Sequence, residues 1–314
     1  MREMPKRDGI VLGYHEKQPL FPSKRFAMPP KQDWSRLFPN VNDPDKRQQL
    51  LDKPAPRVKY IIAFTPRSGS SYLCDVMKRN KVFGRPDEYL SLNFAPDLLR
   101  HAPGKSGEEY LDLILRHTTQ WGAAGLKASW FHFRDFLPQL APDRSFSDFK
   151  FIYLTRRSLA DQAVSLYRAT ETNVFHTNIK HGEEKLDALK KLRYDYDKID
   201  RWFQHLDTQE RGWQHFFNKH NIFPLTLTYE EIEADVARVA KRAATFLALP
   251  HLGRLQQVST ESVFTKLAER RSLKWACKYL LEKDEKARAA QAEAAVAAAP
   301  QSGSVTATPA PGQA

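Results

Sequence analysis

The segment from Val58 to Asn80 constrains the fold more than any other part of the chain. A short apolar run, VKYIIAF, is followed by the loop TPRSGSS, and apolar residues then recur at helical spacing from position 72 to position 77. This order predicts a buried strand, a tight loop and a helix. The first N–H groups of such a helix are unpaired and point into the loop, where they attract anions. A phosphate or a sulfonate fits this arrangement.

The loop itself has the chemistry of an anion site. Arg67 can bind an anion through two parallel N–H groups, Gly69 permits a close turn, and Ser68, Ser70 and Ser71 supply hydroxyls. The alternative is that the serines serve only as helix caps. The chain has neither GxGxxG nor GxxxxGK[ST] here, and no lysine follows Gly69, which disfavours Mg²⁺-dependent hydrolysis of ATP or GTP.

A second strand with a basic end follows later in the chain. The run KFIYLT, at residues 150–155, leads into Arg156 and Arg157 and then into a helical pattern. Ser165 comes eight residues after Arg157, about two turns along that helix. An arginine at the strand end and a serine two turns later can hold one phosphate from two sides. Solvated loop charges and a serine without a role are the alternative.

Apolar, β-rich runs alternate with helical patterns along the chain, at residues 58–64, about 122–127, 150–155 and 224–229. Such alternation predicts a single α/β domain with a central parallel sheet flanked by helices. The predicted strand ends carry Arg67, Lys127 and Arg157. Open parallel sheets bind their ligands at the carboxyl ends of the strands.

The chain resembles the superfamily of sulfotransferases that use 3′-phosphoadenosine 5′-phosphosulfate (PAPS), and most closely its bacterial trehalose 2-sulfotransferase-like family. Five blocks between residues 58 and 280 carry the resemblance: TPRSGSSYLC, GRPDEYL, AGLKASW, YLTRRSLADQAVSLYRATET and LTLTYEEI. The resemblance implies a P-loop-like sulfotransferase fold. It also implies an enzyme that moves a sulfuryl group from PAPS to a hydroxyl of a carbohydrate or glycolipid, without a metal.

The resemblance also assigns roles to residues. Those implied to hold the 5′ end of PAPS are Arg67, Ser68, Gly69, Ser70 and Ser71. Arg157 and Ser165 would hold its 3′-phosphate, and Glu88 of GRPDEYL would be the general base that takes the proton of the acceptor hydroxyl. Asp87 is the local rival for that role, and both carboxylates could instead simply lie on a surface loop.

The loop departs from the wider superfamily, where many members have a lysine in this loop and a histidine as the base. Arg67 stays charged and can bind bidentately, but it is a poor proton donor. Structural or surface roles are expected for His101 and His132. Lys127 and Trp130 are predicted to bind substrate, although an aromatic residue beside a strand commonly packs in the core.

Two other function classes remain open on the residues alone. One is a P-loop-like phosphotransferase, which the missing Walker lysine disfavours. The other is a non-catalytic protein that binds phosphonucleotides, which the presence of Glu88 argues against. The net charge of +12 suits nucleic acid as well as a polyanionic donor, but the basic residues are scattered and no nucleic-acid motif is present.

Composition and segment character set the remaining expectations. The chain has 41% hydrophobic and 27% charged residues, which is typical of a globular protein. It has no apolar run near the length of a membrane helix and no visible secretory signal, so a cytoplasmic location is expected. Neither CxxC nor a His-rich spacing indicates a metal site. We expect a basic, Pro-rich extension at 1–57, a sulfotransferase domain at 58–283 and a disordered Ala-rich tail at 284–314. The extension is expected to drape over the domain or to be partly mobile, and covering the acceptor cleft is the alternative.

One long amphipathic helix is predicted from Leu186 to Leu206, where apolar residues keep three- and four-residue steps. Packing against the sheet is the first interpretation of its apolar face. A homodimer interface is the alternative.

Overall fold

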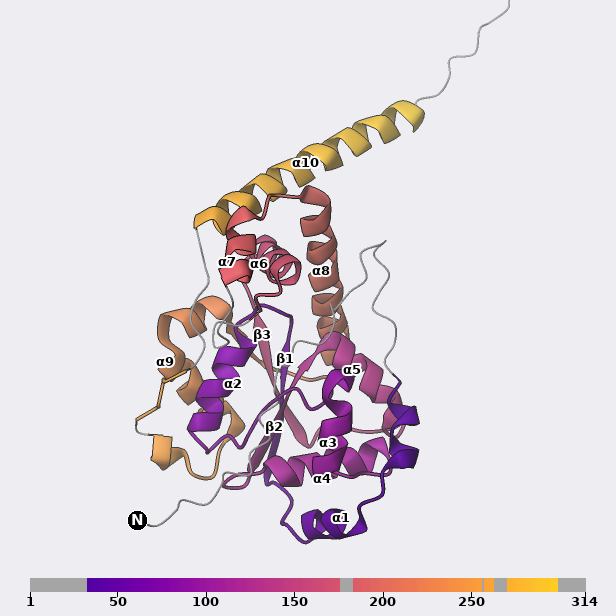
Figure 1. Cartoon of the computed structure of the whole chain (residues 1–314), viewed down its shortest axis with the longest axis vertical. Coiled ribbons are helices and arrows are strands. Elements are labelled where there is room, and N and C mark those ends of the chain that lie inside the picture. The colour runs from indigo at the N-terminus through magenta and orange to yellow at the C-terminus, as the bar shows by residue number, and fades with distance from the viewer. Residues whose placement is uncertain (1–32, 176–182, 256, 263–269, 299–314) are drawn as a thin grey trace, which may run out of the picture.

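A parallel sheet forms the centre of the protein. The computed structural model describes residues 33–175, 183–255, 257–262 and 270–298. The sheet has the strand order β2-β1-β3-β4 (Figure 1), with β1 at Val58–Phe64, β2 at Ala123–Ser129, β3 at Phe149–Thr155 and β4 at Leu225–Thr228. All neighbouring strands are parallel, so their carboxyl ends meet at one edge. The predicted fold class and the four predicted strands are therefore confirmed.

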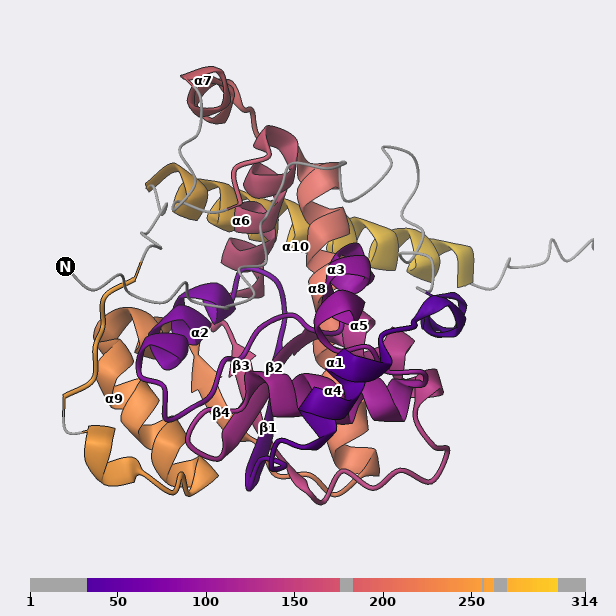
Figure 2. The ribbon, with the colours of Figure 1, turned by 60° about the horizontal axis from the view of Figure 1, so that its bottom comes forward.

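Helices cover both faces of the sheet (Figures 1 and 2). The helices that pack on the sheet are α2 (Ser70–Arg79), α3 (Ala95–His101), α4 (Gly107–Thr118), α5 (Trp130–Phe136), α8 (Tyr196–Lys219) and α9 (Tyr229–Leu247). Successive side chains of β1 point to opposite faces. Ile61 and Ala63 join the core with α3, α4, α5 and α8, whereas Tyr60 and Ile62 join the core with α2 and α9. Because β1 is buried on both sides from Tyr60 onward, its residues from Tyr60 to Phe64 are all apolar.

The described part of the predicted N-terminal extension packs on the domain. It contains two short 3₁₀ helices, Trp34–Arg36 and Phe38–Asn40, and the helix α1, Pro44–Leu51. Trp34 is fully buried, and its ring lies 5.3 Å from that of Tyr110 on α4. Trp34, Phe38 and Leu50 thus belong to the same core cluster as α4 and α5. Residues 1–32 lie outside the described part.

The prediction of one long helix from Leu186 to Leu206 is wrong. The structure has α7 at Glu183–Lys191 and then α8, with a non-helical linker between them. Asp195 begins α8, because its carboxylate accepts a hydrogen bond of 3.0 Å from the N–H of Lys198 and so caps the new helix. The helical spacing of apolar residues continues across the linker because Leu192 also packs against the cluster formed by α8 and its neighbours.

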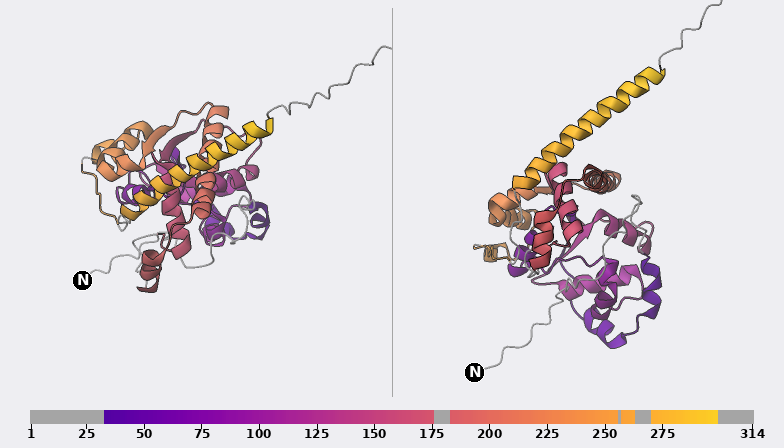
Figure 3. Two further views of the ribbon diagram at one scale, coloured as in Figure 1. Left: turned by 90° about the horizontal axis from the view of Figure 1, so that it is seen from above. Right: turned by 45° about the horizontal axis from the view of Figure 1, so that its top comes forward.

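The helix α10, Arg270–Ala298, packs at its start against α6 (Leu159–Thr172) and α8, and its second half projects from the body (Figure 3). It runs without a break through the predicted domain boundary at 283. Alanine has the highest helix propensity of all residues, so an Ala-rich stretch continues a helix that has already formed. Residues 299–314 lie outside the described part.

Within the described residues, no helix combines the length and the apolar character needed to cross a membrane. In the same ranges, no group of three or more His, Cys, Asp or Glu side chains is placed to hold a metal ion.

His205 makes the stability of the fold depend on pH. It lies on α8, with 4% of its surface exposed and its ring 5.0 Å from that of Phe131. Burial lowers its pKa to about 4, from an ordinary value of about 6.5. The unfolded chain therefore binds more protons than the folded one between these two values, and stability falls as the pH drops through this window.

We expect His205 alone to remove about 2 kcal/mol of unfolding free energy between pH 7 and pH 5. The measurement is urea unfolding of the wild type and of His205→Phe at both pH values. The variant is expected to lose about 2 kcal/mol less than the wild type on acidification. The same loss in both proteins would contradict the assignment of a buried neutral imidazole.

Candidate active site

The loop after β1 turns directly into α2 at the carboxyl edge of the sheet. Gly69 has φ +83°, and a Cβ at this position would lie 3.0 Å from the ring of Tyr229, so both the backbone and the space favour glycine. Ser70 and Ser71 are the first residues of α2, so the unpaired N–H groups of this helix point into the loop. The predicted combination of a helix start and hydroxyl groups is present.

Arg67 connects this loop to α6, the helix after β3 that carries Ser165. Its Nε donates to the Ser165 hydroxyl of α6 at 3.1 Å, although 98 residues separate the two, and its Nη1 donates to the backbone oxygen of Phe175 at 2.6 Å. Burial and the nearby Arg156 lower the pKa of Arg67 to about 10, so it remains protonated at neutral pH. The two strand ends that the sequence assigned to opposite ends of one nucleotide are thus adjacent.

The two arginines at the end of β3 have different surroundings. Arg157 is exposed, and its backbone N–H donates to the Glu230 carboxylate at 3.2 and 3.3 Å. Arg156 lies over the Tyr229 ring at 4.6 Å, and its buried Nε has no hydrogen-bond partner among the described residues. Because a Cβ at Gly69 would lie 3.0 Å from the Tyr229 ring, Arg156 lies near the loop. The sequence prediction selected Arg157 for the 3′-phosphate, and Arg156 is a second arginine at this strand end.

The loop is anchored from the side of α6. The Gln162 amide donates to the Thr65 hydroxyl and to the backbone oxygen of Pro66, each at 2.7 Å. Ser68 is fully buried, and within the described ranges its hydroxyl has no hydrogen-bond partner. A buried hydroxyl without a partner is costly, so its presence at an anion loop suits a polar ligand.

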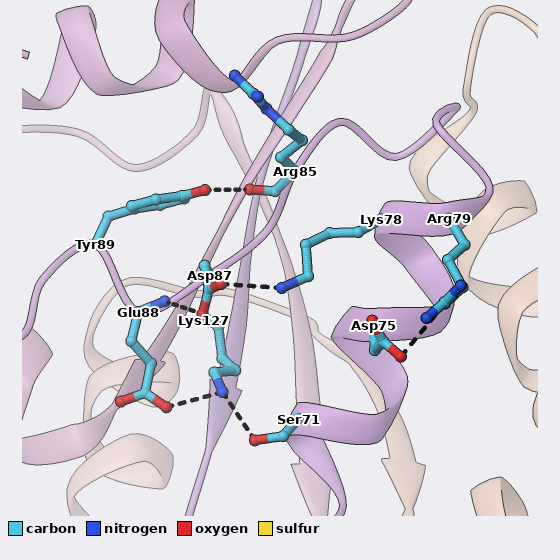
Figure 4. A network of polar contacts seen from close by, with 9 residues as sticks. All are labelled: Ser71, Asp75, Lys78, Arg79, Arg85, Asp87, Glu88, Tyr89 and Lys127. Carbon is cyan, nitrogen blue, oxygen red and sulfur yellow. Dashed lines mark hydrogen bonds and ion pairs between the residues drawn. The ribbon is translucent and has the colours of Figure 1, made fainter. Parts of the chain in front are cut away.

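Asp87 and Glu88 follow the sheet rather than lie on a free surface loop. The backbone oxygen of Asp87 accepts from the N–H of Lys127 on β2 at 2.9 Å, which fixes the segment beside that strand. The Asp87 carboxylate contacts Lys78 at 3.0 Å (Figure 4). Burial raises the pKa of Asp87, but Lys78 and Lys127 outweigh it and hold the pKa below its ordinary value. The Asp87 carboxylate therefore forms an ion pair with Lys78 of α2.

Glu88 points away from Lys78, and its carboxylate lies beside the ammonium group of Lys127, which separates it from Ser71 (Figure 4). Its Oε1 lies 2.8 Å from Nζ of Lys127, and the same nitrogen lies 3.2 Å from the Ser71 hydroxyl. Only 1% of the Lys127 side chain is exposed, compared with 16% for Glu88. The buried ammonium group of Lys127 therefore contacts both the predicted base, Glu88, and the hydroxyl of Ser71.

His132 lies next to Glu88, although the sequence predicted only a structural or surface role for it. Its Nδ1 lies 3.9 Å from Oε2 of Glu88. Burial lowers the pKa of His132, although Glu88 and Asp135 oppose this, so the ring is neutral at pH 7. Ser129 caps α5 by accepting from the backbone N–H of His132 at 3.4 Å, so His132 lies in the first turn of that helix. By contrast, the ring of His101 contacts that of His117.

Trp130 is the first residue of α5, and its side chain packs against α8. Its ring lies 5.4 Å from that of Trp213, and a Cβ at Gly212 would come within 2.2 Å of its Nε1. These contacts agree with the core role that the sequence left as the alternative to ligand stacking.

The matched family model supplies the observation that decides the class of protein. A model described as Stf0 sulphotransferase matches residues 59–282, which include every predicted site residue. This chain belongs to the Stf0 sulphotransferase family. It is therefore a sulfotransferase, and the resemblance inferred from the sequence is confirmed.

Two curated relatives of this Stf0 sulphotransferase carry the name trehalose 2-sulfotransferase. The protein of Mycolicibacterium smegmatis (strain ATCC 700084 / mc(2)155) is 24% identical over 267 residues, which cover 70% of this chain and 93% of the relative. The protein of Mycobacterium tuberculosis (strain ATCC 35801 / TMC 107 / Erdman) is 23% identical over 263 residues, which cover 71% and 94%. The similarity thus extends over nearly the whole length of both relatives.

Proposed function

We propose that this Stf0 sulphotransferase moves a sulfuryl group from PAPS to a hydroxyl of a carbohydrate or glycolipid acceptor, with Glu88 as the general base. The observation that carries the proposal is the hydrogen bond between Arg67 and Ser165, which joins the loop after β1 to the helix after β3. A nucleotide with phosphates at both its 5′ and 3′ positions presents two anionic groups to two such neighbouring elements.

The residues present fit this donor. Arg67, Ser68, Gly69, Ser70 and Ser71 would hold the 5′ end, where α2 begins. Arg157 and Ser165 would hold the 3′-phosphate. The buried Ser68 hydroxyl and the Nε of Arg156, both without a hydrogen-bond partner in the described part of the chain, are further polar groups suited to such a ligand.

Glu88 and the loop would divide the chemistry between them. Glu88 accepts the proton of the acceptor hydroxyl, which makes that oxygen a better nucleophile toward sulfur. Arg67 and the N–H groups at the start of α2 stabilise the negative charge that builds up on the departing phosphate. The donor brings the activated sulfuryl group, and the protein holds it in line with the attacking oxygen.

The acceptor class is inferred from the relatives. Both are named for sulfation of trehalose, a carbohydrate, and the neighbouring polar side chains of Glu88 and His132 suit a hydroxyl-bearing ligand. A P-loop-like phosphotransferase is disfavoured, because the position after Gly69 is Ser70 and no Walker lysine is present.

Donor preference is the test of this proposal. The protein is incubated with a mixture of carbohydrates and glycolipids and with either ³⁵S-labelled PAPS or γ-labelled ATP. We expect transfer of the sulfur label only, together with a gain in acceptor mass equal to one SO₃ group. Transfer of the phosphoryl label would support the phosphotransferase alternative, and binding of nucleotide without transfer of either label would support a non-catalytic role.

A further inference from the structure

Lys127 is the most deeply buried cation of the site. It lies on β2, in register with Ile62 of β1, with 1% of its side chain exposed. Its Nζ lies 5.2 Å from the centroid of the Phe64 ring. An ammonium group in such surroundings is costly unless charged and polar partners surround it. Glu88 and Ser71 provide those partners.

The direction of the hydrogen bonds follows from the chemistry of an ammonium group, which only donates. The Ser71 hydroxyl must therefore accept from Lys127, and its own proton is left to point elsewhere. Ser71 belongs to the first turn of α2, at the anion loop. Likewise, Oε1 of Glu88 accepts from Lys127, and Oε2 is the carboxylate oxygen on the side of His132.

The backbone makes this arrangement rigid. The N–H of Lys127 donates to the backbone oxygen of Asp87, so the residue next to Glu88 is fixed to the same strand position. Asp87 is in turn paired with Lys78, in the last turn of α2. Both ends of α2 are thus connected to the segment that carries Glu88, one through Lys78 and the other through Lys127.

We propose that Lys127 is a positioning residue that sets Glu88 and Ser71 for sulfuryl transfer. It holds the Glu88 carboxylate with Oε2 directed at the acceptor hydroxyl, and it turns the Ser71 O–H toward the phosphosulfate of the donor. The inference depends on the proposed function. It replaces the acceptor contact predicted for Lys127 from the sequence, because a side chain with 1% exposure offers the acceptor almost no surface.

Three variants measured with wild type test the proposal: Lys127→Met, Ser71→Ala and the double variant. We expect Lys127→Met to lower kcat by ~10²–10³, since a misplaced catalytic group costs about this much, with the KM for the acceptor nearly unchanged. We expect the double variant to be no slower than Lys127→Met, because Ser71 acts through the same contact. Lys59→Met, which breaks the ion pair with Asp148 at the opposite edge of the sheet, is the matched control with unchanged kcat.

Each outcome separates the inference from the proposed function. A higher KM for the acceptor with unchanged kcat would identify Lys127 as an acceptor contact and overturn the inference, as would multiplicative effects of Lys127→Met and Ser71→Ala. Failure of the wild type to transfer sulfur would overturn the proposed function and the inference with it. If Lys127→Met does not fold, Lys127→Gln, which keeps an N–H donor without the charge, replaces it in the same comparison.

A crystal structure of the ligand-free Lys127→Met protein gives a readout without turnover. We expect the Glu88 side chain to leave the position that it has in Figure 4. A Glu88 side chain that keeps its place without the ammonium group would contradict the positioning role.

Discussion

Replacing Glu88 with Gln is expected to lower the rate of sulfuryl transfer by ~10²–10⁴ while the affinity for 3′-phosphoadenosine 5′-phosphate stays nearly unchanged. The amide has the size of the carboxylate and can still accept a hydrogen bond from Lys127, but it cannot take a proton from the acceptor. The elements proposed to hold the donor, which are the loop after β1, the start of α2 and α6, are not altered. The measurements are steady-state kinetics and isothermal titration calorimetry with the same preparation.

Asp87→Asn is the matched control for this experiment. It removes the rival carboxylate, which is paired with Lys78, and is expected to lower the free energy of unfolding while sulfuryl transfer continues. Full activity of Glu88→Gln, or a loss of activity confined to Asp87→Asn, would show that Glu88 is not the general base.

Replacing Arg67 with Met is expected to weaken binding of 3′-phosphoadenosine 5′-phosphate and to lower kcat/KM for the donor by ~10²–10³. Arg67 supplies a fixed charge at the loop and contacts both Ser165 and the backbone of Phe175, so its loss removes a proposed phosphate ligand and a link between the loop and α6. Calorimetry and initial rates at varied donor concentration measure the two effects.

Arg67→Lys is the control that separates charge from geometry. Lysine keeps the charge but has no bidentate fork, so its effect should lie between those of Met and wild type. If Arg67→Met binds the nucleotide as tightly as the wild type, donor binding does not depend on Arg67.

The strand β1 was predictable because it lies in the interior of the sheet, between β2 and β3. A strand buried on both faces needs a continuous apolar run, and the buried part of β1, from Tyr60 to Phe64, is one. Helix ends were harder to predict. The linker before α8 depends on the cap at Asp195, and the apolar spacing on either side of it does not reveal the interruption.

The candidate site was predictable where it depends on local motifs. The loop after β1 and the arginine-serine spacing after β3 are both visible in the sequence, and the structure makes them neighbours because β1 pairs with β3. The meeting of Ser71, Lys127 and Glu88 depends on side chains from three separate segments. No spacing rule joins such segments, so these contacts needed the structure.

The choice between Arg156 and Arg157 shows a similar limit. Side chains of consecutive residues at the end of an extended strand point in different directions, so spacing alone does not identify the one that borders the loop. In the structure Arg156 packs over Tyr229 and Arg157 is exposed, so a complex with the nucleotide is needed to show which of the two contacts the 3′-phosphate.

A crystal structure of the protein with 3′-phosphoadenosine 5′-phosphate tests the central claim most directly. We expect the 5′-phosphate to contact the N–H groups and hydroxyls of residues 67–71 and the 3′-phosphate to contact Ser165 together with Arg157 at the end of β3. A nucleotide bound away from the edge where β1 and β3 end, or one that contacts only a single strand end, would contradict the account.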